Sequence, residues 1–357
     1  GAVMRLLNWV QSLIRRSRTH ETAGVRHRGP ATHVVILDGT MSSLEVGCET
    51  HAGQLYKLLQ EASGGTKRAA NLTIYYEPGI QWTDWGETLD VMLGRGINSQ
   101  IKRAYGVLAS RYLSGDRIVL AGYSRGAYAV RSLAGVIDLV GLVRTDCATE
   151  RNVQLAYRHY RRGGRGLAAE AFRKRMCHAT VTIEAVAVWD TVKALGVRLP
   201  ILWRWSVVEH AFHNHALGAS VRHGFHALAL DETREAYAPV LWACPPGWSG
   251  KMEQVWFAGT HGDVGGQING YEPARPLANL SLVWMLEQLE RCKIPLPDGW
   301  AARFPTDATA PSVGLVRGWA KLFWSRKARG VGRDASERPH PSVAKNRPDD
   351  SKVALRN

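Results

Sequence analysis

The cysteines are too few and too scattered for a disulfide framework or a zinc ribbon. The 357 residues hold five cysteines, an odd number, and no two of them form a C-x-x-C pair. A disulfide-stapled domain would show an even set, and a zinc ribbon would show paired C-x-x-C motifs. We therefore predict neither, and the pattern fits a reducing compartment. The cysteines are Cys48, Cys147, Cys177, Cys244 and Cys292.

The sequence also has no long hydrophobic run. No apolar stretch approaches the roughly 20 residues that span a bilayer, so we expect no transmembrane segment. The stretch LLNWVQSLI at residues 6–14 is flanked by arginines and lacks a small-residue cleavage site, which argues against a secretory signal peptide. It is typical of a short amphipathic helix at a membrane interface. We expect a cytoplasmic protein, or one exported without a cleavable signal peptide.

Acidic residues are scarce relative to basic ones, which leaves a formal net charge of +15. Residues 1–30 hold six arginines against one glutamate, and residues 326–357 hold nine Lys or Arg against four acids. Basic ends of this kind favour weak contact with anionic membrane surfaces, and solvated tails are the simplest alternative. The interior is close to neutral, so we do not expect nucleic-acid binding. No oligomeric state is predicted.

Five continuous runs of apolar, largely β-branched residues predict buried strands. Strands buried on both faces of a parallel sheet have this unbroken hydrophobic pattern. Helical patterns lie between the runs, and this alternation predicts an α/β fold with a mostly parallel, doubly wound sheet. The predicted strands cover residues 33–37, 72–76, 117–121, 181–189 and 254–259. The helical patterns cover residues 49–62, 97–113, 127–143 and 277–290.

The domain prediction is a single α/β domain over residues 31–357, preceded by a basic N-terminal helix and linker at residues 1–30. Two stretches interrupt the alternation of strands and helices, at residues 150–178 and 196–230. We interpret both as helical cap insertions over one edge of the sheet. Residues 325–357 form a basic tail.

The motif Gly122-Tyr123-Ser124-Arg125-Gly126 stands between a predicted strand and a predicted helix. In α/β-hydrolases the nucleophilic serine occupies such a strand-to-helix turn, written G-x-S-x-G. Glycines on either side of the serine tolerate unusual dihedral angles and allow backbone and helix to approach closely. The motif and its context predict that Ser124 is a nucleophile and that Gly122 and Gly126 form its elbow.

A nucleophilic serine needs a base and a group that orients the base. Two later predicted strands end at Asp190 and at His261, so the chain order Ser124, Asp190, His261 is the one this fold requires. Alternatively, Asp190 caps a turn and His261 is a loop histidine bonded to Asp263. Asp263 is the main alternative acid, and Asp231 is a weaker one.

Oxyanion donors are expected beside the nucleophile and in the loop after the first strand of the sheet. These positions point to the N–H groups of Arg125 and of Gly39 or Thr40, with Asp38 shaping the loop. Such chemistry needs no metal or organic cofactor, and we predict none. Five histidines between residues 210 and 226 lack an H-E-x-x-H spacing, so we interpret them as a helical surface and not as a zinc site.

Taken together, the sequence resembles the bacterial α/β-hydrolase family typified by type VI secretion phospholipase effectors. The resemblance implies a serine hydrolase acting on ester bonds, with lipid or phospholipid esters as substrates. It assigns the nucleophile to Ser124, the base to His261 and the acid to Asp190, and it implies that the C-terminal tail packs on the domain. The motifs within residues 34–266 are LDGT, YYEPG, GYSRGAYAVRSLAG, VAVWDTV, FHALALDETR and VWFAGTHGDVGG, with weaker similarity in WMLEQ and HPSV.

Three residues depart from the family pattern near the expected mouth of the site. They are Met41, His51 and Gln267, where the family tends to have tryptophan, asparagine and glycine. We expect these differences to affect substrate choice more than catalysis. The alternatives to a lipid esterase are an esterase for small soluble esters and a catalytically silent, hydrolase-like binding module.

Overall fold

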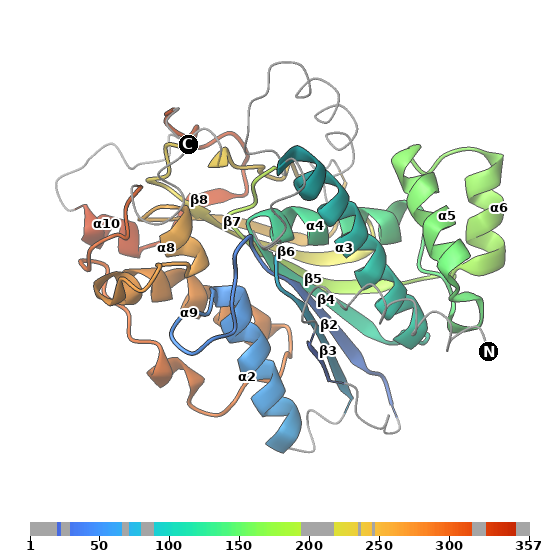
Figure 1. The fold of residues 1–357 in the computed structure, drawn as a ribbon, viewed down its shortest axis with the longest axis horizontal. Helices are drawn as coiled ribbons and strands as arrows, with labels where there is room; N and C mark the ends of the chain where they lie inside the picture. The colour runs from blue at the N-terminus through green and yellow to red at the C-terminus, as the bar shows by residue number, and fades with distance from the viewer. Residues whose placement is uncertain are drawn as a thin grey trace.

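The computed structural model describes residues 20–22, 29–65, 71–79, 89–193, 218–234, 237–244, 247–315 and 326–347. A single sheet runs through this part of the chain in the order β1-β3-β2-β4-β5-β6-β7-β8 (Figure 1). Strands β2 to β8 are parallel, and β1 pairs antiparallel with β3. The strands are β1 His20–Thr22, β2 Thr32–Leu37, β3 Leu72–Glu77, β4 Arg117–Tyr123, β5 Thr182–Trp189, β6 Val221–Ala229, β7 Lys251–Phe257 and β8 Glu337–Pro339.

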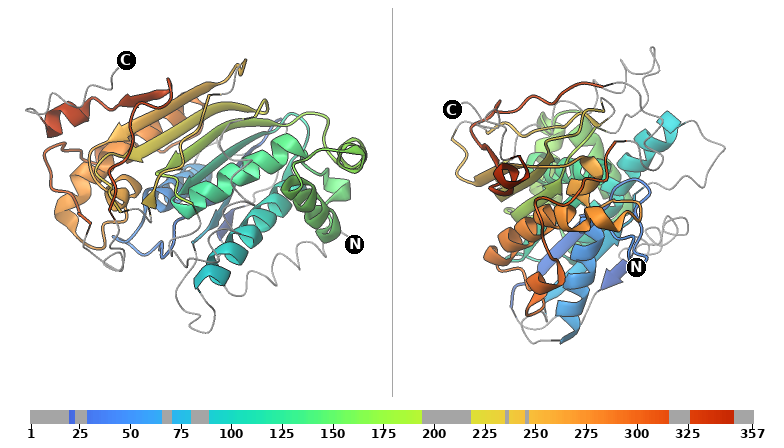
Figure 2. Two further views of the ribbon diagram at one scale, coloured as in Figure 1. Left: turned by 90° about the horizontal axis from the view of Figure 1, so that it is seen from above. Right: turned by 90° about the vertical axis from the view of Figure 1, so that its left-hand side faces the viewer.

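Helices cover both faces of the sheet (Figure 2). The residues of β4 explain the unbroken apolar pattern, because Leu120 packs with α3 and α4 on one face while Val119 and Ala121 pack with α2 and α9 on the other. The predicted doubly wound α/β architecture is thus confirmed, and the G-x-S-x-G motif lies at the turn from β4 into α4 as the sequence predicts. The helices are α2 His51–Gly65, α3 Leu89–Arg111, α4 Arg125–Leu139, α5 Glu150–Arg161, α6 Leu167–Met176, α8 His261–Gly265, α9 Arg275–Arg291 and α10 Ser342–Asn346.

The segment predicted as a second cap insertion, residues 196–230, contains a strand of the sheet. Residues 221–229 form β6, between β5 and β7, so for these residues the prediction was wrong. An arginine, two histidines and a glycine interrupt the apolar run of β6, which hid the strand pattern. His226 is nevertheless fully buried, because its Nε2 accepts the Thr191 N–H at 3.1 Å. Residues 194–217, with the other three histidines of the cluster, lie outside the described residues.

The other predicted insertion, residues 150–178, consists of the helices α5 and α6. They extend the layer of α3 and α4 and lie at the end of the molecule opposite α8 and α10 (Figures 1 and 2). Gly163 and Gly164 take φ values of 90° and 68° in the turn that separates the two helices. The helices α5 and α6 therefore lie away from the strand ends that carry Ser124 and His261.

Both ends of the chain contribute strands to the sheet. Residues 20–22, predicted as part of a linker, form β1, and the predicted N-terminal helix at residues 6–14 lies outside the described residues. In the basic tail, β8 runs beside β7, with Glu337 opposite Gln254. Among the helices described, none is both long and apolar enough to cross a bilayer.

Candidate active site

Ser124 lies at the sharp turn between β4 and α4. Its φ of 61° is unusual for a residue with a side chain, and such strain persists only where the surroundings impose it. The two flanking glycines are required sterically, since a Cβ at Gly122 would lie 2.7 Å from the Gly126 oxygen and one at Gly126 would lie 2.1 Å from the Leu37 oxygen. The G-x-S-x-G motif thus matches the close packing of this turn.

The structure brings Ser124, His261 and Asp190 together from three different strand ends. The Nε2 atom of His261 lies 2.8 Å from Ser124 Oγ, and its Nδ1 atom lies 2.5 Å from Asp190 Oδ2. All three residues are buried. Because an ionised carboxylate only accepts hydrogen bonds, Nδ1 carries the proton and the lone pair of Nε2 faces the serine hydroxyl.

Two aromatic rings and a glutamate hold the His261 residue. The rings of Tyr123 and Tyr237 lie with their centroids 4.9 and 4.6 Å from the imidazole centroid. The backbone N–H of His261 donates to Glu232 Oε2 at 3.0 Å, and Arg234 in turn donates to both Glu232 oxygens. Sequence reasoning did not assign roles to Glu232 and Arg234, although both lie in the FHALALDETR motif.

Asp190 is surrounded by hydrogen-bond donors. Its Oδ1 accepts the Ala229 N–H at 2.9 Å and Arg329 Nη1 at 2.6 Å, and its Oδ2 accepts Arg329 Nη2 at 2.9 Å as well as His261 Nδ1. Burial raises the pKa of Asp190, but the Arg329 charge and the bond from His261 outweigh it and hold the pKa well below its usual range. Asp190 is therefore ionised at neutral pH.

Burial has the opposite effect on the pKa of the His261 imidazole. It lowers the pKa of His261 below its ordinary value, although the bond to Asp190 raises it. The histidine is therefore neutral at pH 7 and able to accept a proton at Nε2. An ionised acid, a neutral histidine and a serine hydroxyl in hydrogen-bonding sequence form the arrangement of an acyl-transfer triad.

Comparison with known families identifies the relatives of this chain. Residues 32–288 match the model of the family described as T6SS, phospholipase effector Tle1-like, catalytic domain. The chain belongs to this family. The resemblance noted in the sequence is thereby confirmed.

The individual relatives of this Tle1-like chain are distant. The uncharacterized protein YEL023C of Saccharomyces cerevisiae is 28% identical over 229 residues, which make up 54% of this chain and 33% of that protein. The chain thus spans about a third of the length of this relative.

Two solved structures resemble the Tle1-like chain at low identity. A crystal structure of an uncharacterized protein from Pseudomonas aeruginosa matches with a TM-score of 0.44 and 13% identity, over 85% of this chain and 52% of that one. The apo form of Thermogutta terrifontis esterase 2 matches with a TM-score of 0.39 and 11% identity, over 79% and 92% of the two chains.

Hydrogen bonds in the loop after β2 of the Tle1-like domain distinguish between the candidate oxyanion donors. The N–H of Gly39 already donates to Asp38 Oδ1 at 2.7 Å, so it is not free to bind an oxyanion. Thr40 is held in place by Gln267, whose Nε2 donates to the Thr40 oxygen at 3.0 Å, and by Arg125, whose Nη1 lies 3.4 Å from Thr40 Oγ1. The geometry therefore favours the N–H groups of Thr40 and Arg125 over that of Gly39.

Asp38 shapes this loop, as expected from the sequence. It is buried and accepts hydrogen bonds from the hydroxyls of Thr50 and Tyr76 as well as from Gly39. Burial raises its pKa to about 6. Of the three departures from the family pattern, Gln267 thus contacts the loop directly, Met41 is partly exposed, and His51 is buried with its Nδ1 donating to the Val264 oxygen.

The alternative acids have other partners. The carboxylate of Asp263 accepts the N–H groups of Thr260 and Val313, both at 2.8 Å, and so caps α8 and ties it to a distant loop. Asp231 accepts the Gly259 N–H at 2.7 Å and contacts Arg347. In the described part of the chain, the imidazole of His261 contacts Asp190 and neither of these acids.

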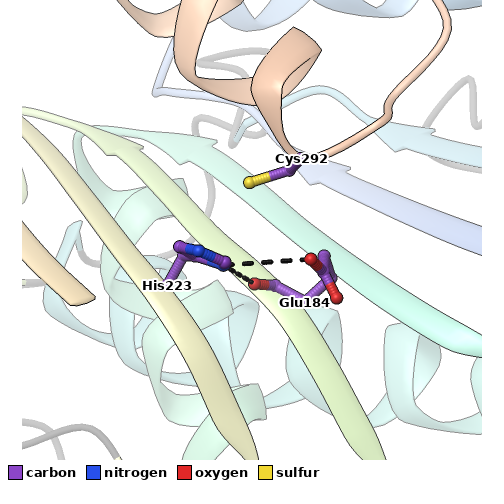
Figure 3. Close-up of side chains that lie close together, drawn as sticks. All are labelled: Glu184, His223 and Cys292. Carbon is purple, nitrogen blue, oxygen red and sulfur yellow. Dashed lines mark hydrogen bonds and ion pairs between the residues drawn. The ribbon is translucent and has the colours of Figure 1, made fainter. Parts of the chain in front are cut away.

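A separate group of metal-ligating side chains lies at the opposite ends of β5 and β6. Figure 3 shows Cys292 pointing from the end of α9 toward Glu184 and His223, and ligand atoms of the three lie within 4.8 Å of one another. The Nδ1 atom of His223 already donates to the backbone oxygen of Glu184 at 2.9 Å. Since Ser124 and Asp190 follow the other ends of β4 and β5, this group takes no part in the triad.

Proposed function

We propose that the protein is a serine hydrolase that cleaves carboxylic ester bonds, with lipid or phospholipid esters as its substrates. The observation that supports this most is the hydrogen-bonded sequence from Ser124 Oγ to His261 Nε2 and from His261 Nδ1 to Asp190. Membership in the Tle1-like family supports the choice of substrate class.

The reaction proceeds through an acyl-enzyme. Ser124 Oγ attacks the ester carbonyl while His261 Nε2 takes the hydroxyl proton, and the N–H groups of Arg125 and Thr40 stabilise the oxyanion. The imidazolium then gives its proton to the departing alcohol as the acyl bond to that alcohol breaks. Water attacks the acyl-serine with His261 as base, and the carboxylic acid leaves. Asp190 remains ionised throughout and stabilises the imidazolium.

Covalent labelling tests the proposal directly. A fluorophosphonate probe should label the wild-type protein at Ser124, and Ser124→Ala should remove both the label and ester hydrolysis, with kcat lower by about 10⁴-fold or more. Ser132→Ala is the matched control, because Ser132 is likewise a buried serine but lies within α4 and not at the turn before it. A folded wild-type protein that the probe does not label would instead be a silent binding module.

A substrate panel separates lipid esters from small soluble esters. Hydrolysis of phospholipid vesicles and of short-chain nitrophenyl esters should be compared at matched enzyme concentration. We propose that the basic ends bring the enzyme to anionic surfaces, so cosedimentation with anionic vesicles should exceed that with neutral vesicles and should fall at high salt. Equal recovery in the supernatant under all conditions would contradict this surface contact.

A further inference from the structure

Asp190, the proposed catalytic acid, contacts a positively charged side chain from a distant part of the sequence. Arg329 lies 139 residues after Asp190, in the tail segment 326–347, and its side chain is only 3% exposed. Its two terminal nitrogens each donate to one oxygen of the Asp190 carboxylate. The family match ends at residue 288, so this arginine lies outside the matched region.

We propose that Arg329 is a positioning residue for Asp190, so that the tail segment 326–347 completes the active site. This inference rests on the proposed function, since it assigns a role within the same triad. The segment is fixed to the domain independently, through the pairing of β8 with β7 and through the bond from Trp256 Nε1 to Glu337 Oε1 at 3.0 Å. Arg329 is thus supplied by a part of the fold that is already anchored.

The contacts of Arg329 require an arginine. Besides Asp190, Nη1 donates to the Ala229 oxygen at 2.8 Å and Nη2 donates to the Tyr237 oxygen at 2.6 Å. The guanidinium therefore joins the turn after β5, the end of β6 and the residue whose ring packs on His261. A planar fork can make these four bonds at once, whereas a lysine ammonium is a single point donor.

The position of the carboxylate decides how well the base works. Asp190 must present Oδ2 to His261 Nδ1 to keep the correct tautomer, and its backbone φ of 41° shows that it sits on a strained turn. Without Arg329, the Asp190 carboxylate would keep one hydrogen bond at each oxygen, from the Ala229 N–H and from His261, and would take up a proton more readily. Arg329 adds a second bond at each oxygen and favours the ionised form.

The positive charge also affects the histidine. Arg329 disfavours protonation of His261, so its removal should make the imidazole more basic. Other charged or titratable groups face this pair from several elements and stay unchanged in the test. They are Tyr123 on β4, His226 on β6, and Glu232, Arg234 and Tyr237 in the segment after β6.

Substitutions at Arg329 test the positioning role. Arg329→Met should lower kcat by about 10²-fold or more with little change in KM, because an acid that is misplaced weakens the base and not substrate binding. The acidic limb of its pH–rate profile should move upward by about half a unit or more. Arg338→Met is the matched control, since Arg338 is an exposed arginine of the same tail paired with Glu253, and it should leave both quantities unchanged.

Arg329→Lys separates charge from geometry. It should keep the acidic limb near its wild-type position but still lose about tenfold or more in kcat, because one ammonium cannot hold both oxygens. Circular dichroism and thermal unfolding establish that each variant is folded. If Arg329→Met does not fold, a folded Arg329→Lys protein with wild-type kcat overturns the proposal on its own.

A double-mutant cycle with Asp190→Asn provides the decisive measurement. If Arg329 acts through Asp190, the double variant Asp190→Asn/Arg329→Met should be no slower than Asp190→Asn alone. A full multiplicative loss, or an Arg329→Met enzyme within threefold of wild type with an unmoved acidic limb, would overturn the inference. Failure of the proposed function looks different, since the wild-type protein itself would then not be labelled by the fluorophosphonate probe.

Discussion

The carboxyl ends and the amino ends of the strands each carry an acid and a histidine, but in different settings. At the carboxyl end, the buried pair Asp190 and His261 shares a bond of 2.5 Å. At the amino end, the side chains of Glu184 and His223 are 12% and 25% exposed, and their nearest carboxylate distance is 3.9 Å. The same residue types therefore make a tightly bonded pair at one end and a loose, partly solvated pair at the other.

The difference lies in the third partner of each pair. Ser124 faces the free nitrogen of His261, whereas the group beside His223 is Cys292, whose pKa is raised by burial to about 11. A thiol with so high a pKa is protonated at neutral pH and is a poor nucleophile. An acid and a histidine in proximity are thus not sufficient for nucleophilic catalysis, since this also needs a third group that can be activated and a histidine with a fixed tautomer.

The largest expected effect is at the carboxyl end. Asp190→Asn should cut kcat by about 10⁴-fold, because an amide at this position supports the wrong histidine tautomer. Glu184→Gln, the equivalent change at the amino end, should leave kcat within about twofold. Steady-state kinetics on one ester substrate measure both values of kcat. A severe loss of kcat in Glu184→Gln would contradict the difference between the carboxyl-end and amino-end pairs.

Asp263→Asn tests the alternative acid and should act on stability more than on rate. Its carboxylate accepts two backbone N–H groups, and replacing it should lower the free energy of unfolding by about 1–3 kcal/mol. Urea denaturation followed by fluorescence measures this loss. If Asp263→Asn is instead fully stable but loses activity to the extent expected for Asp190→Asn, then Asp263 is the acid.

The pH profile should show the effect of burial at His261, the proposed base. The base must be neutral, and because the pKa of His261 lies below its usual value, activity should be retained as pH falls below about 6.5. The decline in kcat/KM should begin only at lower pH. An acidic limb centred above 6.5 in the wild-type enzyme would contradict the burial effect.

The smallest expected effect comes from removing the side chain of Cys292 or any metal bound near it. Cys292→Ser and treatment with a chelator should both leave ester hydrolysis within about twofold of the untreated wild type. Hydrolysis rates before and after dialysis against the chelator give the measurement. A loss that is restored by added zinc would show that the amino-end group matters for the reaction.

Local patterns in the sequence were sufficient to predict most of the sheet and the order of the candidate residues. The runs that became β2, β3, β4, β5 and β7 are unbroken and apolar, and Ser124, Asp190 and His261 each follow one of them. Strand β6 escaped prediction because its polar residues are satisfied by distant partners, as when His226 accepts the Thr191 N–H. Burial of polar side chains is a tertiary property that hydrophobic periodicity does not report.

The sequence by itself determined the α/β architecture, the serine elbow and the family, because each of these depends on residues close together in the chain. Only the tertiary structure showed that His261 contacts Asp190 and not Asp263, that the Gly39 N–H is bonded to Asp38, and that Arg329 contacts Asp190. These relations join side chains that are far apart in sequence or depend on the direction of a single N–H. Hydrogen bonds of this kind form only after the strands have packed, so no local pattern encodes them.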